Sequence, residues 1–290
     1  MTTYQIITDA STDGFDVLFN DLPEIQVLPM DVSINDTSYL YGVDGNISAK
    51  SFYSLQRSGK FAHTSQITPA AFCQYFTPFL EQGNDILYLG LTSGLSGTMQ
   101  SAELAAEQLK ALYPERRIVC LDTYCASVGQ GFIVLETLRR QKEGYSLDEL
   151  ITWITDNRMQ VCHWFTVDVF EHLKHGGRVS GASAALGTVL NIKPMLHLNA
   201  AGQLEVTDKL RGRKRAIEAK VTKMTQGWDS TLGNLVVIGH GDCMEAALEM
   251  KTLVAARFPE ADIRIAEIGP VIGAHTGPGM LALIYWGSNR

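Results

Sequence analysis

The sequence predicts an α/β protein made of two α/β domains. Short apolar segments, typical of buried strands, alternate with longer segments of helical spacing, which indicates strand–helix–strand units around a largely parallel sheet. In the second half, the segment 193–208 has a turn near its centre and predicts a β-hairpin, so we expect a mixed sheet there. We place the boundary near residue 160, with an N-terminal domain over 1–160 and a C-terminal domain over 161–290.

Each element is predicted from its own local pattern. Apolar runs bounded by polar or turn-forming residues indicate strands at 5–8, 25–28, 85–91, 117–121, 161–166, 235–238, 263–267 and 280–286. Helical patterns indicate helices at 69–80, 97–112, 127–143, 147–158, 214–226 and 244–258. Thr68 and Pro69 are typical of a helix start, and Ser146 is suited to cap the helix that follows it.

Composition excludes several classes of protein. The 290 residues are 46% hydrophobic and 19% charged, which is a globular mix and unlike a disordered chain. The formal net charge of −7 argues against a protein whose main task is to bind nucleic acid. The five cysteines are an odd number without a Cys-x-x-Cys pair, so we interpret them as reduced core thiols of a cytoplasmic protein.

The sequence predicts neither a signal peptide nor a membrane span. The N-terminus has no basic segment ahead of an apolar one and reaches an acid at Asp9. The segment 268–287 has no formal charge, and a membrane-spanning helix needs about 20 residues of this kind. It also contains Pro270, Pro278 and several glycines, which a lone helix in lipid tolerates poorly. We therefore expect a buried loop that runs into a core strand.

The segment 63–69 has more hydroxyl groups than a helix start requires. Thr68 alone is enough to cap the following helix, so Thr64 and Ser65 are available for another role. The competing interpretation is an ordinary loop that leads into the cap. We take Thr64 and Ser65 as candidate ligand-binding residues.

The segment 91–98, Leu-Thr-Ser-Gly-Leu-Ser-Gly-Thr, connects an apolar strand to an alanine-rich helix. Free backbone N–H groups at a helix start, together with the hydroxyl groups of Ser93 and Ser96, are typical of an anion site. Gly97 would let the backbone approach the anion closely. The segment is no P-loop, because it has no lysine, and it lacks the spacing of a nucleophile elbow. The alternative is a tight strand-to-helix turn.

Histidines occur in two further segments that contain glycine. His172 and His175 have the spacing of a metal-binding pair, but no third ligand is evident, so we interpret them as solvated helix histidines. The two glycines that follow are typical of a helix end, and a functional role fits them equally well. His275 and Thr276 stand in a frame of glycines and prolines that fixes the backbone, which favours a functional His275 over a buried core histidine.

The segment 210–215, Leu-Arg-Gly-Arg-Lys-Arg, is the dense basic run of this acidic sequence. Charge runs usually form a solvated face. This run, however, opens a predicted helix, where positive charges are at the unfavourable end of the helix dipole. The misfit favours a docking surface for an anionic partner.

These motifs, in this order, resemble the DegV family of bacterial fatty-acid-binding proteins. The matches span nearly the whole chain and are Thr8-Asp-Ala-Ser-Thr-Asp13, His63-Thr-Ser-Gln66, Thr92-Ser-Gly-Leu-Ser-Gly-Thr98, Gly176-Gly-Arg-Val-Ser180 with Lys193-Pro194, and Gly273-Ala-His-Thr-Gly-Pro-Gly279. The sequence departs from the family at Ile67, where proline is frequent, and at Ala10, where a serine hydroxyl is missing.

The resemblance implies two α/β domains with a long-chain fatty acid, such as a C16–C18 acid, in a tunnel between them. The carboxylate ligands of the family fall on Thr64 and Ser96, with His275 and Thr276 near the head group. Some members are subunits of fatty acid kinase, which present the acid to a separate kinase subunit that forms an acyl-phosphate for phospholipid synthesis. An arginine linked to this transfer falls on Arg211.

The sequence therefore predicts a lipid carrier without a metal or resident cofactor. We find no nucleotide cradle and no Mg²⁺ ligand set, so the chain itself should not be a kinase. The competing class is an enzyme, a small esterase or acyl hydrolase that uses Ser96 and His275. A third hypothesis is a binding protein for another amphiphile, such as an isoprenoid or a retinoid-like acid.

Overall fold

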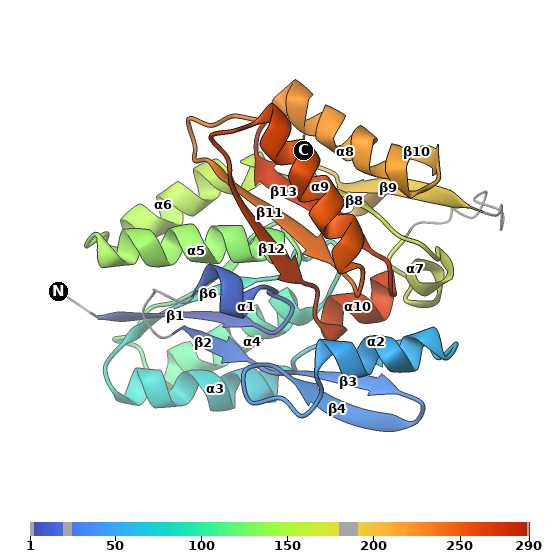
Figure 1. Cartoon of the computed structure of the whole chain (residues 1–290). Coiled ribbons are helices and arrows are strands. Elements are labelled where there is room, and N and C mark those ends of the chain that lie inside the picture. Colours follow the sequence, from blue (N-terminus) through green and yellow to red (C-terminus); the bar gives the residue numbers. More distant parts are fainter. Residues whose placement is uncertain (1–2, 20–24, 180–190, 289) are drawn as a thin grey trace.

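The computed structural model describes residues 3–19, 25–179, 191–288 and 290. The first half of the chain contains a sheet of four parallel strands in the order β2-β1-β6-β7 (Figure 1). These strands are β1 (Tyr4–Asp9), β2 (Gln26–Leu28), β6 (Asp85–Gly90) and β7 (Ile118–Asp122). All six residues of β6 are buried, as expected for a central strand covered on both faces.

The second half forms a six-stranded mixed sheet in the order β10-β9-β8-β13-β11-β12, in which only β11 and β12 pair in parallel. Its strands are β8 (Val161–Thr166), β9 (Ile192–Leu198), β10 (Leu204–Arg211), β11 (Leu235–His240), β12 (Asp262–Glu267) and β13 (Leu281–Trp286). The predicted fold class, with a parallel sheet first and a mixed sheet second, is confirmed. The domain boundary near residue 160, just ahead of β8, stays a prediction.

A third, antiparallel sheet in the order β4-β3-β5 was not predicted. It consists of β3 (Met30–Ile34), β4 (Thr37–Tyr41) and β5 (Ala62–Thr64), and α2 (Ala49–Arg57) belongs to the same apolar cluster. The short helix α1 (Phe15–Leu18) instead contacts β12. β3 alternates buried and less buried residues, which is the ordinary signal of a half-buried strand, but the run is only five residues long. This small sheet matters because β5 ends at Thr64.

Helices separate and cover the two large sheets (Figure 1). α5 (Val128–Lys142) lies between them and contacts β6, β8 and β13, with α6 (Leu147–Asn157) beside it. α3 (Pro69–Glu81) and α4 (Thr98–Leu112) pack against the parallel sheet, and α8 (Arg213–Gly227) and α9 (Met244–Arg257) against the mixed sheet. The short elements are η1 (Arg158–Gln160), α7 (Glu171–His175) and α10 (Pro270–Thr276). Thr68 caps α3 and Ser146 forms a capping box on α6, as predicted.

The main core surrounds α5. Residues 128–138 of this helix are all buried, and they pack against apolar residues of both large sheets, including Leu89 and Phe165. A helix that is buried on every side needs apolar or small residues all round, and this explains its weak amphipathic pattern in the sequence. The two halves of the chain therefore share one continuous apolar core.

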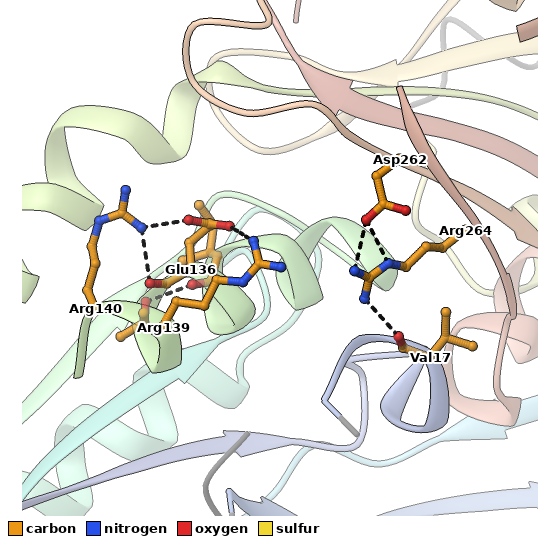
Figure 2. Close-up of polar contacts among 8 residues, drawn as sticks. Val17, Glu136, Arg139, Arg140, Asp262 and Arg264 are labelled. Atoms are coloured by element: carbon orange, nitrogen blue, oxygen red, sulfur yellow. Dashed lines mark hydrogen bonds and ion pairs between the residues drawn. The ribbon is translucent and has the colours of Figure 1, made fainter. Parts of the chain in front are cut away.

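Ion pairs within single elements lie at the edge of this core, beside one hydrogen bond that joins the halves (Figure 2). On α5, Glu136 pairs with Arg139 at 2.7 Å and with Arg140 at 2.6 Å. On β12, Arg264 pairs with Asp262 and donates to the backbone carbonyl of Val17 in α1 at 3.1 Å. The ion pairs thus lie within α5 and within β12, and in this group the hydrogen bond from Arg264 to Val17 is the contact that joins the two halves.

The predicted buried loop at 268–287 was wrong in part. Residues Pro270–Thr276 form α10, and β13 follows. Pro270 stands at the first helical position and Gly277, with φ of 73°, follows the last one, and both are ordinary signals of a helix start and end. Among the described residues, no helix combines the length and the apolar character that crossing a membrane requires.

Candidate functional site

A cavity of about 850 Å³, including its open side, lies between the two halves of the chain. Most of the lining is apolar and includes Leu91, Val128, Phe165, Leu173, Leu198 and Ile284. Six polar lining residues lie together, and we call this part the head-group end: Thr64, Ser65, Gln66, Ser96, Arg178 and His275.

The centre of the head-group end is a hydrogen bond between Thr64 and His275. Thr64 is the last residue of β5, His275 is in the last turn of α10, and Thr64 Oγ1 lies 2.8 Å from His275 Nε2. Either atom can be the donor, because the hydroxyl both donates and accepts. The two residues are 211 positions apart in the sequence, so only the tertiary fold brings them together.

His275 is held as a neutral imidazole. Burial lowers its pKa to about 4, and the positive charge of Arg178 and the nearby His63 act in the same direction. Its Nδ1 atom has no hydrogen-bond partner among the described residues and lies against Gly176, where a Cβ atom would collide with it. Gly176 follows α7 as predicted, and it also makes room for this ring.

α10 is fixed by buried hydrogen bonds from two directions. From α2, Tyr53 donates to the carbonyl of Ile268 at 2.9 Å and Gln56 donates to that of Gly273 at 3.0 Å. From the loop after β1, Asp13 accepts the backbone N–H of Gly269 at 2.8 Å. The position of His275 is therefore set by residues that sequence patterns did not single out.

The second hydroxyl of the predicted site, Ser96, caps the start of α4. Its Oγ accepts the backbone N–H of Thr98 at 3.2 Å and lies 2.9 Å from the Thr98 hydroxyl. Gly97 does not line the cavity, but a Cβ atom at this position would collide with Gln66, which does. Gly97 thus leaves room for the Gln66 side chain, and the close approach of its backbone to an anion stays a prediction.

Arg178 is the site residue that sequence reasoning missed. It lines the cavity, with Nε donating to the carbonyl of Leu95 at 3.1 Å and one terminal nitrogen donating to that of Gly176 at 2.5 Å. Burial lowers the pKa of its guanidinium below the ordinary value. Within the described ranges no carboxylate forms an ion pair with it. Its signal in the sequence was its place directly after the two glycines that end α7.

The structure thus brings together five of the predicted residues at the cavity: Thr64, Ser65, Ser96, His275 and Thr276. The Thr276 hydroxyl donates to the carbonyl of Ile272 within α10, at 3.1 Å. Ser93 is exposed, does not line the cavity and donates its backbone N–H to Asp122. Ser127, which no pattern suggested, lines the cavity with φ of 57° and donates its hydroxyl to the buried Asp13 at 2.5 Å.

The family model called DegV, described as an uncharacterised protein of the DegV family, matches residues 3–287. The chain belongs to the DegV family. It is 37% identical over 290 residues to a DegV domain-containing protein of Clostridium perfringens, covering 100% of this chain and 99% of that one.

Solved structures of DegV proteins have the same fold. The chain superposes with a TM-score of 0.85 and 29% identity on a fatty-acid-binding DegV family protein from Thermus thermophilus, over 99% of this chain and 100% of that one. A fatty acid kinase B3 protein from Streptococcus pneumoniae, loaded with linoleic acid, superposes with a TM-score of 0.87, 20% identity and the same coverage. At that identity the second likeness concerns the fold alone.

The basic run of this DegV protein divides into paired and exposed charges. Arg213, at the start of α8, pairs with Asp168 at 2.5 Å, and Lys193 pairs with the same carboxylate at 2.9 Å. Asp168 therefore offsets the unfavourable placement of a cation at a helix N-terminus. Arg211, the last residue of β10, is exposed and does not line the cavity.

The two histidines of α7 have different environments. His175 is exposed and its Nε2 lies 3.2 Å from that of His63. His172 is buried, and its ring packs against Phe61 with centroids 5.0 Å apart, so the expectation of two solvated histidines was wrong for this residue. No group of three metal-ligating side chains comes together in the part of the chain that the structure describes.

Proposed function

We propose that this DegV protein holds a long-chain fatty acid in the cavity, with the carboxylate at the head-group end, and presents it to a separate kinase subunit. One observation carries the proposal: Arg178, which has no ion pair with any described carboxylate, stands beside the hydroxyls of Thr64 and Ser96 at one end of a cavity that is otherwise mostly apolar. A molecule with one anionic end and a long apolar body matches this lining. The similarity to the fatty-acid-binding DegV protein from Thermus thermophilus also supports this proposal.

Burial of the chain supplies the binding energy. Each buried CH₂ group contributes roughly 0.8 kcal/mol, so a chain of about 16 carbons gains on the order of 10 kcal/mol. This is enough for tight retention without a covalent bond.

Polar groups at the head-group end remove the cost of burying the carboxylate. A charge without partners is prohibitively expensive to bury. Thr64 and Ser96 offer hydroxyl donors, once Ser96 turns its hydrogen from Thr98, and Arg178 offers a counter-charge. A neutral His275 with its proton on Nε2 donates to Thr64 Oγ1 and leaves the Thr64 hydroxyl hydrogen free for the carboxylate.

The kinase step rests on the resemblance of the motifs and on the exposed Arg211. In this proposal the chain does no chemistry, and Arg211 contacts the kinase subunit or the phosphate it transfers. Arg211→Ala should then lose acyl-phosphate formation with a bacterial fatty acid kinase subunit, while the purified variant keeps its bound lipid. Loss of lipid from Arg211→Ala would contradict this assignment.

Mass spectrometry of an organic extract tests the lipid itself. The purified protein should yield about one C16–C18 acid per chain, and an empty protein would contradict the proposal. Thr64→Val should weaken fatty-acid binding roughly tenfold or more, because a hydrogen bond to a charged group contributes about 1.5–3 kcal/mol. Thr276→Val is a matched control, because the Thr276 hydroxyl is already bonded to Ile272. Equal losses in both variants would refute the role of Thr64.

No observation favours the esterase hypothesis. It needs Ser96 within reach of His275 and an acid behind the histidine. In the described residues Ser96 bonds to Thr98, Thr64 occupies His275 Nε2, and His275 Nδ1 faces Gly176. Turnover of a short nitrophenyl ester that Ser96→Ala abolishes would revive this hypothesis.

A further inference from the structure

Two exposed histidines meet beside the head-group end. His63 is in β5, directly before Thr64, and His175 is the last residue of α7, directly before Gly176. Their Nε2 atoms lie 3.2 Å apart. The spacing in the sequence paired His175 with His172, but the structure pairs it with a histidine from the other half of the chain. The proposed head-group chemistry uses neither His63 nor His175.

Both rings are held by their surroundings. The ring of His175 is stacked on Phe61, with centroids 4.6 Å apart and planes at 26°. Phe61 in turn packs against the buried ring of His172. The backbone of His63 is fixed in the small sheet, where it pairs with Ser33 of β3. Ligands that are oriented before binding lose little conformational freedom when an ion arrives.

The separation of the two nitrogens fits a metal ion. Zinc binds imidazole nitrogen at about 2.0–2.1 Å, so two ligands of a tetrahedral site lie about 3.3–3.4 Å apart, close to the observed 3.2 Å. The two ring centroids are 4.8 Å apart, whereas a straight N–H···N bond of this length would place them about 5.5 Å apart. The rings are therefore tilted away from the line between the nitrogens, as two ligands of one ion are.

We propose that His63 and His175 form a two-histidine site for a divalent transition-metal ion such as Zn²⁺, with water in the remaining positions. Neutral imidazole suits zinc, copper and nickel as a ligand. Because one ligand comes from each half of the chain, a bound ion joins β5 to α7 next to the head-group end. Neither histidine lines the cavity, so the inference goes beyond the proposed lipid function and does not depend on it.

Zinc titration of the untagged full-length protein, freed of metal with EDTA and dialysed, tests the inference. Calorimetry at pH 7.5 should give one Zn²⁺ per chain for the wild type. His63→Gln and His175→Gln should each bind Zn²⁺ at least roughly tenfold more weakly, because loss of a mere hydrogen-bond partner of a ligand already costs about 10–100-fold. His197→Gln is the matched control and should bind as the wild type does, since His197 lies 4.0 Å from Glu205 in a separate histidine–carboxylate pair.

A wild type that binds no Zn²⁺ would mean that the two rings share only a hydrogen bond, and the inference would be wrong. Undiminished binding in either His63→Gln or His175→Gln would also overturn it, because both ligands are required. A second measurement needs no variant: the ring ¹⁵N resonances of His63 and His175 should both move on addition of Zn²⁺, while those of His197 stay in place. Movement of one ring alone would contradict a shared ion. The lipid content of the purified protein tests the proposed function separately.

Discussion

His275 should make the lipid-free protein acid-sensitive, and His275→Gln should remove part of that sensitivity. The pKa of His275 is lowered from 6.5 to about 4, first by burial and then by Arg178 and His63. The unfolded chain therefore takes up a proton before the folded one. The stability contribution is complete above about pH 6.5 and is lost as the pH falls toward 4.

The magnitude follows from the size of the shift. One pKa unit corresponds to about 1.36 kcal/mol, so the gap of about 2.5 units amounts to about 3 kcal/mol at pH 4 and below. At pH 4.5 most of this loss has occurred, which is on the order of 2 kcal/mol. Glutamine at position 275 keeps a neutral hydrogen-bonding side chain beside Thr64 but has no proton to gain.

Urea unfolding at pH 7 and at pH 4.5 measures the difference. Other buried groups, such as His163, titrate in both proteins, so only the difference between wild type and variant reports on His275. Between the two pH values the wild type should lose about 2 kcal/mol more unfolding free energy than His275→Gln. Equal losses would refute the claim that this imidazole is buried and neutral.

Four further substitutions test other parts of the structure. Gly176→Ala should displace the His275 ring and weaken fatty-acid retention roughly tenfold. Gly177→Ala, with φ of 66° and open space around it, should cost about 1 kcal/mol of stability and leave retention unchanged. Burial raises the pKa of Asp13 to about 7, so its contribution to stability is lost as the pH rises from about 4 to 7; Asp13→Asn should therefore lose about 3 kcal/mol less stability than the wild type between pH 5 and pH 8. Burial lowers the pKa of Lys220 to about 7, so Lys220→Met should lose about 4 kcal/mol less stability than the wild type when the pH falls from 10 to 6. For these last two variants, parallel pH profiles of urea unfolding in variant and wild type would contradict the prediction.

Local chemistry explains which elements the sequence predicts well. The cap at Thr68 and the capping box at Ser146 involve residues three positions apart, so their signals are contained in a few letters. The three-stranded sheet was missed because its strands are short and one of their pairings is distant in the sequence. β3 pairs with β5, about thirty residues further along the chain, and no local pattern shows such a pairing. α10 was missed for a different reason: its Pro270 and Gly277 were interpreted as loop residues, although both also begin and end helices.

The residues of the candidate site also divide into those that the sequence predicted and those that only the structure revealed. Hydroxyl-rich helix starts and a histidine framed by glycines predicted Thr64, Ser96 and His275 as site residues, and all three line the cavity. Arg178 lies in the glycine motif that the sequence analysis quoted, but that motif was interpreted as a helix end, and nothing in the local sequence places the arginine at the cavity. Its environment is set by tertiary packing, which leaves it without an ion pair among the described residues.

The sequence by itself determined the α/β class, the order of a parallel and a mixed sheet, the caps and the family motifs, because each depends on spacing along the chain. Only the tertiary structure decided that Thr64 bonds to His275, that Gly176 and Gly97 make room for His275 and Gln66, and that His63 lies beside His175. The physical reason is that burial and hydrogen-bond satisfaction belong to atoms brought together by packing. No local pattern contains the distance between residues 64 and 275.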